Sequence, residues 1–372
     1  MASDDPYGLS PTKITDSIPA PEVEYKPPHP KNFRPKIGLI GAGGISESHL
    51  RAYRKCGWDV VAIADRTLAK AEAKRDEFHP KAKALDDHRR LLDDPEIDVV
   101  DITPHPPDRL PILREALDAG KHVLSQKPFV LNLNDGEELV NLADTKKVRL
   151  AINQNGRWAP HFSYLRNAVA SGLIGEVTSI DFVLHWDQTW IKGNDAFENI
   201  HHLLLFDFAI HWFDITCCFM KDRHPERVMA AVTKFEGQSF RPPALTSAII
   251  EYPGAQVRMA FNAHTTVGEE DTTTIVGTKG TLRARGTGLN DQSAIEVYLE
   301  EGHVTVPLEG CWFESGFEGA MGELLCAIED DREPYHSAKN NLASLELCFA
   351  ALKSADSGKP VEPGNIRSFH ST

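Results

Sequence analysis

The sequence predicts a two-domain α/β protein in which a doubly wound parallel sheet precedes an α+β unit with a large open, mainly antiparallel sheet. Three observations support this fold class. Apolar strands alternate with helical segments from residue 36 to about residue 153, long strands with few helices between them follow residue 175, and 372 residues exceed the usual size of a single core.

The chain divides into four predicted segments. Residues 1–35 contain eight prolines, which predict either an extended arm that wraps a neighbouring subunit or a disordered leader. Residues 36–153 form the first predicted domain, and residues 154–360 form the second, whose last helices we expect to pack back on the first. Residues 361–372 are expected to form a C-terminal tail.

The first domain alternates strands and helices regularly, which indicates a parallel sheet with helices on both faces. Such sheets bind ligands at the carboxyl ends of their strands. The expected strands are 36–40, 58–64, 82–85, 97–102, 121–125 and 149–153, and the expected helices are 44–56, 67–78, 87–93, 108–119 and 134–145.

The second domain consists mainly of long strands, which is typical of an antiparallel sheet with one uncovered face. The expected strands are 177–186, 226–236, 245–252, 255–264, 272–276, 280–285, 294–299 and 303–306. The expected helices are 201–219, 316–329 and 338–356.

Composition and net charge limit the kinds of molecule that the protein is expected to bind. No apolar run approaches the roughly 20 residues that span a membrane, and no secretory signal is visible, so we expect a cytoplasmic protein without a membrane partner. The net charge of −14 argues against a nucleic-acid surface and is compatible with a small neutral ligand. The six cysteines form no CxxC pair, so we expect free thiols and no metal site.

The stretch KIGLIGAGGIS, residues 36–46, reads as a strand, a tight turn and the start of a helix. Glycines at 41, 43 and 44 would allow backbone N–H groups to approach a pyrophosphate at the helix N-terminus near Ile45. Ser46, at the third position of the GxGxxG pattern, is still small enough for close packing. We therefore expect a dinucleotide-binding Rossmann turn at Gly41, Gly43, Gly44 and Ile45.

Asp65 ends the second strand, 24 residues after Gly41, where an acid hydrogen-bonds the adenosine ribose. A carboxylate there would repel a 2′-phosphate, which favours NAD. Arg66 could instead bind that phosphate, so NADP stays possible.

The helix expected at 201–219 carries Asp207, His211 and Asp214 on one face. A carboxylate four residues before a histidine can hold the imidazole in one tautomer, as a general base requires. The alternative is a buried histidine that these carboxylates satisfy without any catalytic role.

Lys127 follows the fifth strand and precedes Pro128, at the sheet edge where the cofactor is expected. A lysine beside a nicotinamide can polarise a hydroxyl or carbonyl oxygen. The alternative is an ordinary surface lysine at a turn.

These motifs recur together in a known family. The turn GAGGIS with His49 after it, the acid at the end of the second strand, Thr103-Pro104 after the fourth strand, Lys127-Pro128 after the fifth, and the Asp-xxx-His-xx-Asp helix resemble the Gfo/Idh/MocA oxidoreductases over about residues 36–360. The resemblance implies NAD or NADP, a sugar or cyclitol substrate oxidised or reduced at a hydroxyl-bearing carbon, and a homodimer or homotetramer assembled through the open sheet.

The resemblance also implies roles for single residues. Lys127 matches the family lysine, His211 the acid/base histidine, and Asp207 the carboxylate before it. The implied cofactor-binding residues further include Thr103, Pro104, Gln126, Lys127 and Arg157, and the implied substrate-binding residues are Lys127, Arg157, Trp158, His185, Asp207 and His211. His185, with Trp186, ends a strand and is equally compatible with a core or surface position.

Two positions depart from the family pattern. Gln126 stands where the family usually has Glu, so Lys127 lacks one negative charge and should bind its proton less tightly. Ala209 stands where a glycine is usual, and its methyl group slightly crowds the helix.

The favoured function is an NAD(P)-dependent sugar or polyol dehydrogenase. One alternative is a glycoside hydrolase or lyase that oxidises its substrate transiently with tightly held NAD. Another is a non-catalytic nucleotide or sugar sensor, for which Gln126 is the main hint.

Overall fold

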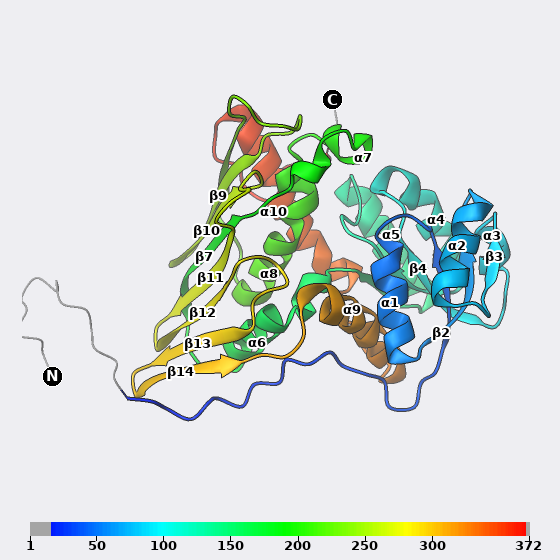
Figure 1. The fold of residues 1–372 in the computed structure, drawn as a ribbon, viewed down its shortest axis with the longest axis horizontal. Helices are drawn as coiled ribbons and strands as arrows, with labels where there is room; N and C mark the ends of the chain where they lie inside the picture. The colour runs from blue at the N-terminus through cyan, green and yellow to red at the C-terminus, as the bar shows by residue number, and fades with distance from the viewer. Residues whose placement is uncertain (1–15, 370–372) are drawn as a thin grey trace, which may run out of the picture.

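The protein is described by a computed structural model covering residues 16–369. Two sheets stand apart, with helices between and around them (Figure 1). The first sheet is entirely parallel and has the strand order β3-β2-β1-β4-β5-β6. Its strands are β1 (Lys36–Ile40), β2 (Asp59–Ala64), β3 (Lys83–Leu85), β4 (Ile97–Ile102), β5 (His122–Ser125) and β6 (Leu150–Ile152).

Helices cover both faces of this sheet, which explains its almost uninterrupted apolar strands. The helix α1 ends at Gly57, whose φ of 69° gives the left-handed cap that glycine adopts without strain. The helices are α1 (Ser46–Cys56), α2 (Leu68–Phe78), α3 (Arg89–Leu92), α4 (Pro106–Asp118) and α5 (Leu133–Lys146).

The second sheet has eight strands in the order β14-β13-β12-β11-β7-β10-β9-β8. All neighbours are antiparallel except β7 and β10, so the predicted fold class is confirmed. The strands are β7 (Val177–His185), β8 (Arg227–Thr233), β9 (Leu245–Tyr252), β10 (Ala255–Asn262), β11 (Glu270–Gly277), β12 (Gly280–Gly286), β13 (Ala294–Leu299) and β14 (Gly302–Pro307).

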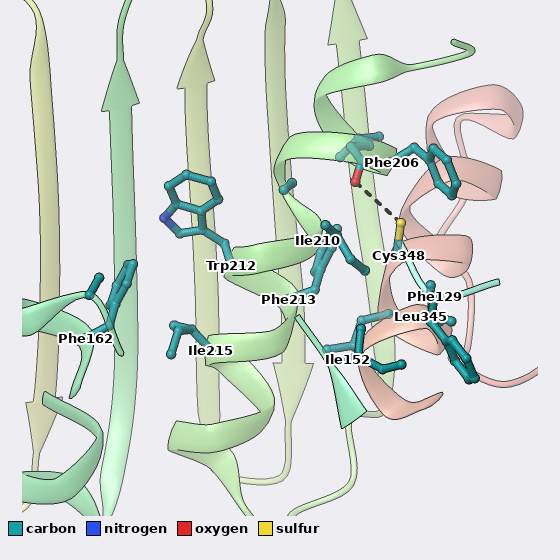
Figure 2. Packing of buried hydrophobic residues seen from close by; sticks show 14 of the residues in the cluster. Phe129, Ile152, Phe162, Phe206, Ile210, Trp212, Phe213, Ile215, Leu345 and Cys348 are labelled. Atoms are coloured by element: carbon teal, nitrogen blue, oxygen red, sulfur yellow. Dashed lines mark hydrogen bonds between the residues drawn. The ribbon is translucent and has the colours of Figure 1, made fainter. Parts of the chain in front are cut away.

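One face of the second sheet carries the helices α6 (Pro160–Ala170), α8 (Ile210–Met220) and α10 (Ala338–Ser357) (Figure 1). Their apolar side chains form a continuous core, of which Figure 2 shows Phe162, Trp212, Phe213 and Leu345. Within this core the Cys348 thiol donates to the Leu205 carbonyl at 3.4 Å, and this hydrogen bond connects α10 to the segment before α8 (Figure 2).

Two local predictions are wrong. The helix expected at 201–219 is broken, because Leu204–Phe208 forms a π-helical turn before α8 begins at Ile210. The helix α6 was not predicted, and residues 155–162 form the short helix Asn155–Trp158 and the start of α6. Two further short helices occur at Thr189–Ile191 and α7 (Asp195–Glu198).

The helix α9 (Trp312–Glu329) joins the two halves of the molecule. Its side chains Phe317, Met321 and Leu324 share one buried cluster with Leu50 and Tyr53 of α1, as expected for closing helices that return to the first sheet.

Residues 16–35 run extended along the same chain, past β14 and α9 (Figure 1). Ser17 pairs with His303 of β14, and the backbone N–H groups of residues 31, 32 and 33 donate to the Glu329 carboxylate at 2.7, 2.6 and 2.8 Å. The described part of the proline-rich arm is therefore docked on its own chain, and residues 1–15 lie outside the described residues.

The C-terminal segment also returns to the fold. The backbone of Val361 pairs with Val228 of β8, and Phe369 donates its N–H to the Leu131 carbonyl at 2.8 Å. Within residues 16–369, none of the helices combines the length and apolar character needed to cross a membrane.

Candidate active site

A cavity of about 1500 Å³ lies between the two halves of the protein. One wall consists of residues at the carboxyl ends of β1, β2, β4 and β5, and the other comes from segment 186–212 and the start of α9. The cavity thus occupies the edge at which parallel α/β sheets bind ligands.

The glycine turn shapes the floor of this cavity. Gly41 has a φ of 96° and a Cβ there would lie 2.6 Å from Thr103 Oγ1, so only glycine fits. A Cβ at Gly43 or Gly44 would meet no atom within 4 Å, so open space remains beside the N-terminus of the 11-residue helix α1. The residues present therefore fit a bound pyrophosphate.

Asp65 closes the same turn and lines the cavity. Its carboxylate accepts from the N–H groups of Ala42 and Thr67, each at 2.8 Å. The neighbouring Arg66 pairs with Asp108 at 3.2 Å through largely exposed side chains. An acid held at this position favours a ribose hydroxyl over a 2′-phosphate.

Thr103 and Pro104, at the end of β4, also line the cavity. Thr103 Oγ1 donates to the Gly41 carbonyl at 2.7 Å, which ties the end of β4 to the glycine turn. The cofactor-site residues predicted at strand ends thus lie together around one cavity.

Lys127 bridges the two walls of the cavity. Its Nζ donates to the Asp207 backbone carbonyl at 2.7 Å and pairs with Asp207 Oδ2 at 3.1 Å. Both side chains are largely buried, 16% and 11% exposed, so this ion pair is shielded from water. The sequence placed both residues in one site but did not predict that they bind each other.

His211 lines the same cavity without a hydrogen bond among the described residues, and its Nδ1 is buried without a partner. Burial, and then the charge of Lys127, keep the pKa of His211 well below its ordinary value, so the ring is neutral at pH 7. The ring meets Trp312 edge-on at 5.4 Å.

The expected orienting role of Asp207 toward His211 is corrected. The π-helical turn before α8 alters the helical spacing, and the Asp207 carboxylate instead accepts from Lys127. Asp214, expected on the same face, lies outside the cavity and binds Arg157.

A buried network of hydrogen bonds leads from Asp101 through His49 and Gln126 to the backbone of Lys127. His49 Nδ1 donates to Asp101 at 2.7 Å, and Gln126 Nε2 donates to His49 Nε2 at 3.1 Å. Gln126 Oε1 in turn accepts from the Lys127 backbone N–H at 2.7 Å. Since the amide donates to Nε2, His49 carries its proton on Nδ1.

Arg109 was missed by the sequence interpretation. It lies on α4, is 1% exposed and lines the cavity. Its guanidinium donates to the carbonyls of Pro104 at 2.8 Å, of Pro128 at 2.6 Å, and of Gln126. Burial lowers the pKa of Arg109 to about 9, so the group stays charged at neutral pH. The sequence offers no signal for this role, because the three carbonyls lie on two loops, one after β4 and one after β5, that are distant from each other in sequence.

Arg157 and Trp158 do not line the cavity, so the geometry does not support the cofactor and substrate roles predicted for them. Arg157 Nε and Nη2 bind the two Asp214 oxygens, each at 2.6 Å, and this carboxylate raises the pKa of Arg157 despite the burial. Trp158 packs against α9, where a Cβ at Gly319 would lie 2.1 Å from its ring. Arg157 therefore links the short helix Asn155–Trp158 to α8, and Trp158 packs the same short helix against α9.

His185 does not line the main cavity, so the geometry favours the alternative position that the sequence left open for it. It lies at the end of β7 beside a separate hollow of about 280 Å³ on the second sheet, together with Thr233, Ser247 and Asn262. Its neighbour Trp186 does line the main cavity.

The second wall of the cavity is mainly aromatic. Trp190, 51% exposed, meets Phe197 edge-on at 5.0 Å, and Phe197 meets His105 of the opposite wall at 6.2 Å. The wall also contains Gln188 and Asn194 as polar members, and its further aromatic residues are Trp186, Phe208, Trp212, Trp312, Phe313 and Phe317.

A glycine turn with open space beside it, an acid at the end of the second strand and a lysine facing the second unit define a nucleotide-dependent oxidoreductase. Comparison with family models agrees: residues 35–154 match the oxidoreductase family with NAD-binding Rossmann fold, and residues 162–283 match the GFO/IDH/MocA C-terminal domain. The chain belongs to the GFO/IDH/MocA family of NAD-binding oxidoreductases.

Similar proteins of known sequence include a D-apiose dehydrogenase from Paraburkholderia graminis, 26% identical across 95% of this chain and 94% of that protein. An inositol 2-dehydrogenase from Rhizobium meliloti is 25% identical across 86% of this chain and 96% of its own length.

Solved structures share the fold. An Agrobacterium radiobacter oxidoreductase in complex with NAD⁺, L-tartaric acid and magnesium has a TM-score of 0.80 at 21% identity, covering 89% of this chain and 98% of that one. A levoglucosan dehydrogenase in complex with NADH and levoglucosan has a TM-score of 0.77 at 18% identity, covering 89% of this chain and all of that one.

Proposed function

We propose that this NAD-dependent oxidoreductase oxidises a hydroxyl-bearing carbon of a sugar, glycoside or cyclitol. The observation that carries the proposal is the meeting of Lys127 and Asp207, with His211 beside them, at the strand ends where the dinucleotide site opens. The names of the relatives, which include apiose and inositol dehydrogenases, support this class of substrate.

The glycine turn and Asp65 would hold NAD, which supplies a hydride acceptor when bound. Lys127 would donate a hydrogen bond to the reacting hydroxyl and stabilise negative charge that develops on its oxygen. His211, neutral and free of protein hydrogen bonds among the described residues, would accept the hydroxyl proton. Asp207 would hold the Lys127 ammonium in place.

The residues that line the second wall of the cavity are suited to binding a neutral polyol. Trp190, 51% exposed, offers a flat apolar surface for the C–H face of a ring, while Gln188 and Asn194 offer hydrogen bonds to its hydroxyl groups. The part of segment 186–212 that lines the cavity carries no lysine or arginine, so a substrate carboxylate would find no cation on that side.

We also propose that the uncovered face of the second sheet forms a homodimer or homotetramer. Met229 and Ile249 are 51% and 38% exposed there, although large apolar side chains are usually buried. Mass measurement in solution by light scattering tests this; a monomer at micromolar concentration contradicts it.

An absorbance screen at 340 nm with polyols, inositols and glycosides, each with NAD and NADP, tests the proposed activity. We expect net NADH formation with at least one neutral polyol. Product release from a glycoside without net absorbance change would instead support transient oxidation, and binding without turnover would support a sensor; either result contradicts the proposal.

A further inference from the structure

A cluster of two histidines and one aspartate lies outside the cavity. His201 Nε2 and His202 Nε2 both point to the same oxygen, Asp356 Oδ1, at 2.9 and 2.8 Å. The three ligand atoms all lie within 4.8 Å of one another. His201 and His202 precede the π-helical turn, whereas Asp356 lies near the end of α10, 154 residues after His202.

The backbone brings the two imidazoles together. Side chains of consecutive helical residues point about 100° apart and do not share a partner. His202 has a φ of 45°, which is uncommon for a residue other than glycine, and the two rings lie 3.8 Å apart between centroids. The turn therefore aims both Nε2 atoms at one point.

We propose that His201, His202 and Asp356 form a site for a divalent transition-metal ion, with Zn²⁺ as the best match. Two imidazole nitrogens and one carboxylate oxygen are ligands that Zn²⁺ prefers, and a water molecule would complete a tetrahedron.

The present distances are compatible with this ion. Zn²⁺ binds nitrogen and oxygen at about 2.0–2.2 Å, so ligand atoms around it lie roughly 3.3 Å apart, a few tenths of an ångström more than the two histidine–aspartate distances of 2.9 and 2.8 Å. Asp356 is 44% exposed and His201 31%, which leaves both side chains room to adjust.

A bound ion would link two elements that position the active site. The His202 carbonyl accepts from the N–H groups of Leu205 and Phe206 at 2.8 and 3.1 Å, which starts the turn that carries Asp207. Joining this turn to α10 through a metal would stabilise the folded state, since the unfolded chain does not hold the three ligands together.

The test is a Zn²⁺ titration of the chelator-treated full chain by calorimetry. A second group, His29, Cys56 and Glu318, could also bind metal, so every protein in the series carries Cys56→Ser. We expect one bound Zn²⁺ and a raised midpoint of thermal unfolding. His201→Ala and Asp356→Asn should each weaken binding on the order of 100-fold.

His88→Ala is the matched control, because His88 also pairs with one carboxylate, Glu115, but belongs to no group of three ligands within residues 16–369. It should leave the Zn²⁺ affinity unchanged. The absence of stoichiometric binding, or equal affinity in His201→Ala, overturns the site. If a variant fails to fold, Co²⁺ added to the Cys56→Ser protein decides: intense visible bands of a tetrahedral nitrogen and oxygen site support the proposal, and their absence contradicts it.

Discussion

The residue at position 126 determines how many protons the buried network next to Lys127 must hold. The Gln126 amide donates to His49 and accepts from the Lys127 backbone N–H. With His49 donating to Asp101, the groups that connect Asp101 to Lys127 all pair a donor with an acceptor while His49 is neutral. His49 Nε2 also lies 3.1 Å from the Asn153 Nδ2 donor. With glutamate, the usual family residue, at position 126, His49 Nε2 would face a carboxylate oxygen beside that donor. One additional proton, on the carboxylate or on His49, would then be needed to restore the hydrogen bond that Gln126 makes.

Gln126→Glu should therefore make the stability of the protein depend on pH. The folded variant would hold a proton that the unfolded chain releases near neutral pH, so its free energy of unfolding should fall as pH rises, by up to about 1.4 kcal/mol per pH unit. Denaturant unfolding at several pH values measures this. Gln256→Glu, on β10, should show no such slope, and equal slopes for the two variants would contradict the proton count.

The neutral ring of His211 predicts the pH dependence of oxidation. Because its pKa lies below 6.5, the ring can accept a proton throughout pH 6.5–8, and this ability is lost only as pH falls through the lowered pKa. The acid limb of kcat/KM should thus lie below pH 6.5. A limb at or above pH 6.5 that disappears in His211→Gln would contradict the assignment.

Among the elements, α4 matters most for the site because it carries Arg109. A single guanidinium satisfies carbonyl groups of the loops after β4 and β5, which fixes the backbone on both sides of Lys127. The rigid placement of these loops therefore depends on one buried cation.

Arg109→Met should destabilise the protein by about 3 kcal/mol or more, since three carbonyls would lose their donor. Arg114→Met is the control on the same helix: its ion pairs with Glu138 and Asp135 are partly exposed, so its removal should cost less than about 1 kcal/mol. Urea unfolding compares the two variants. Equal losses of stability would show that Arg109 does not act as described.

The elements also show what a sequence can predict. The apolar strand runs and the glycine turn are local patterns, so β1 through β6 and the positions of Gly41, Asp65 and Lys127 were predicted correctly. The π-helical turn has no such pattern, and for that reason the partner of Asp207 was wrong. Arg157 and Arg109 were misjudged or missed because their partners, Asp214 and the loop carbonyls, are distant in sequence.

Across the molecule, the N-terminal arm and α9 connect the two sheets. The arm passes so close to α9 that a Cβ at Gly322 would lie 2.1 Å from the Pro28 carbonyl oxygen. The Glu329 carboxylate then accepts three consecutive backbone N–H groups of the arm. These N–H groups lower the pKa of Glu329.

Docking of the arm should therefore depend on the charge of Glu329. It should persist above pH 4.5 and weaken as pH falls through the lowered pKa, because protonation removes the acceptor for three donors. At neutral pH, Glu329→Gln should speed hydrogen exchange at residues 31–33, measured by mass spectrometry. Glu333→Gln, an exposed neighbour, should not; unchanged exchange in Glu329→Gln would contradict this docking mode.

The central claim is that Lys127 acts on the substrate in a cleft where the dinucleotide binds independently of it. The most direct measurement compares the NAD dissociation constant and the turnover rate of Lys127→Met with those of the exposed control Lys339→Met. We expect turnover of Lys127→Met to fall roughly 1000-fold while its NAD affinity changes less than about threefold. Turnover equal to that of Lys339→Met, or loss of NAD binding in proportion to turnover, would contradict the claim.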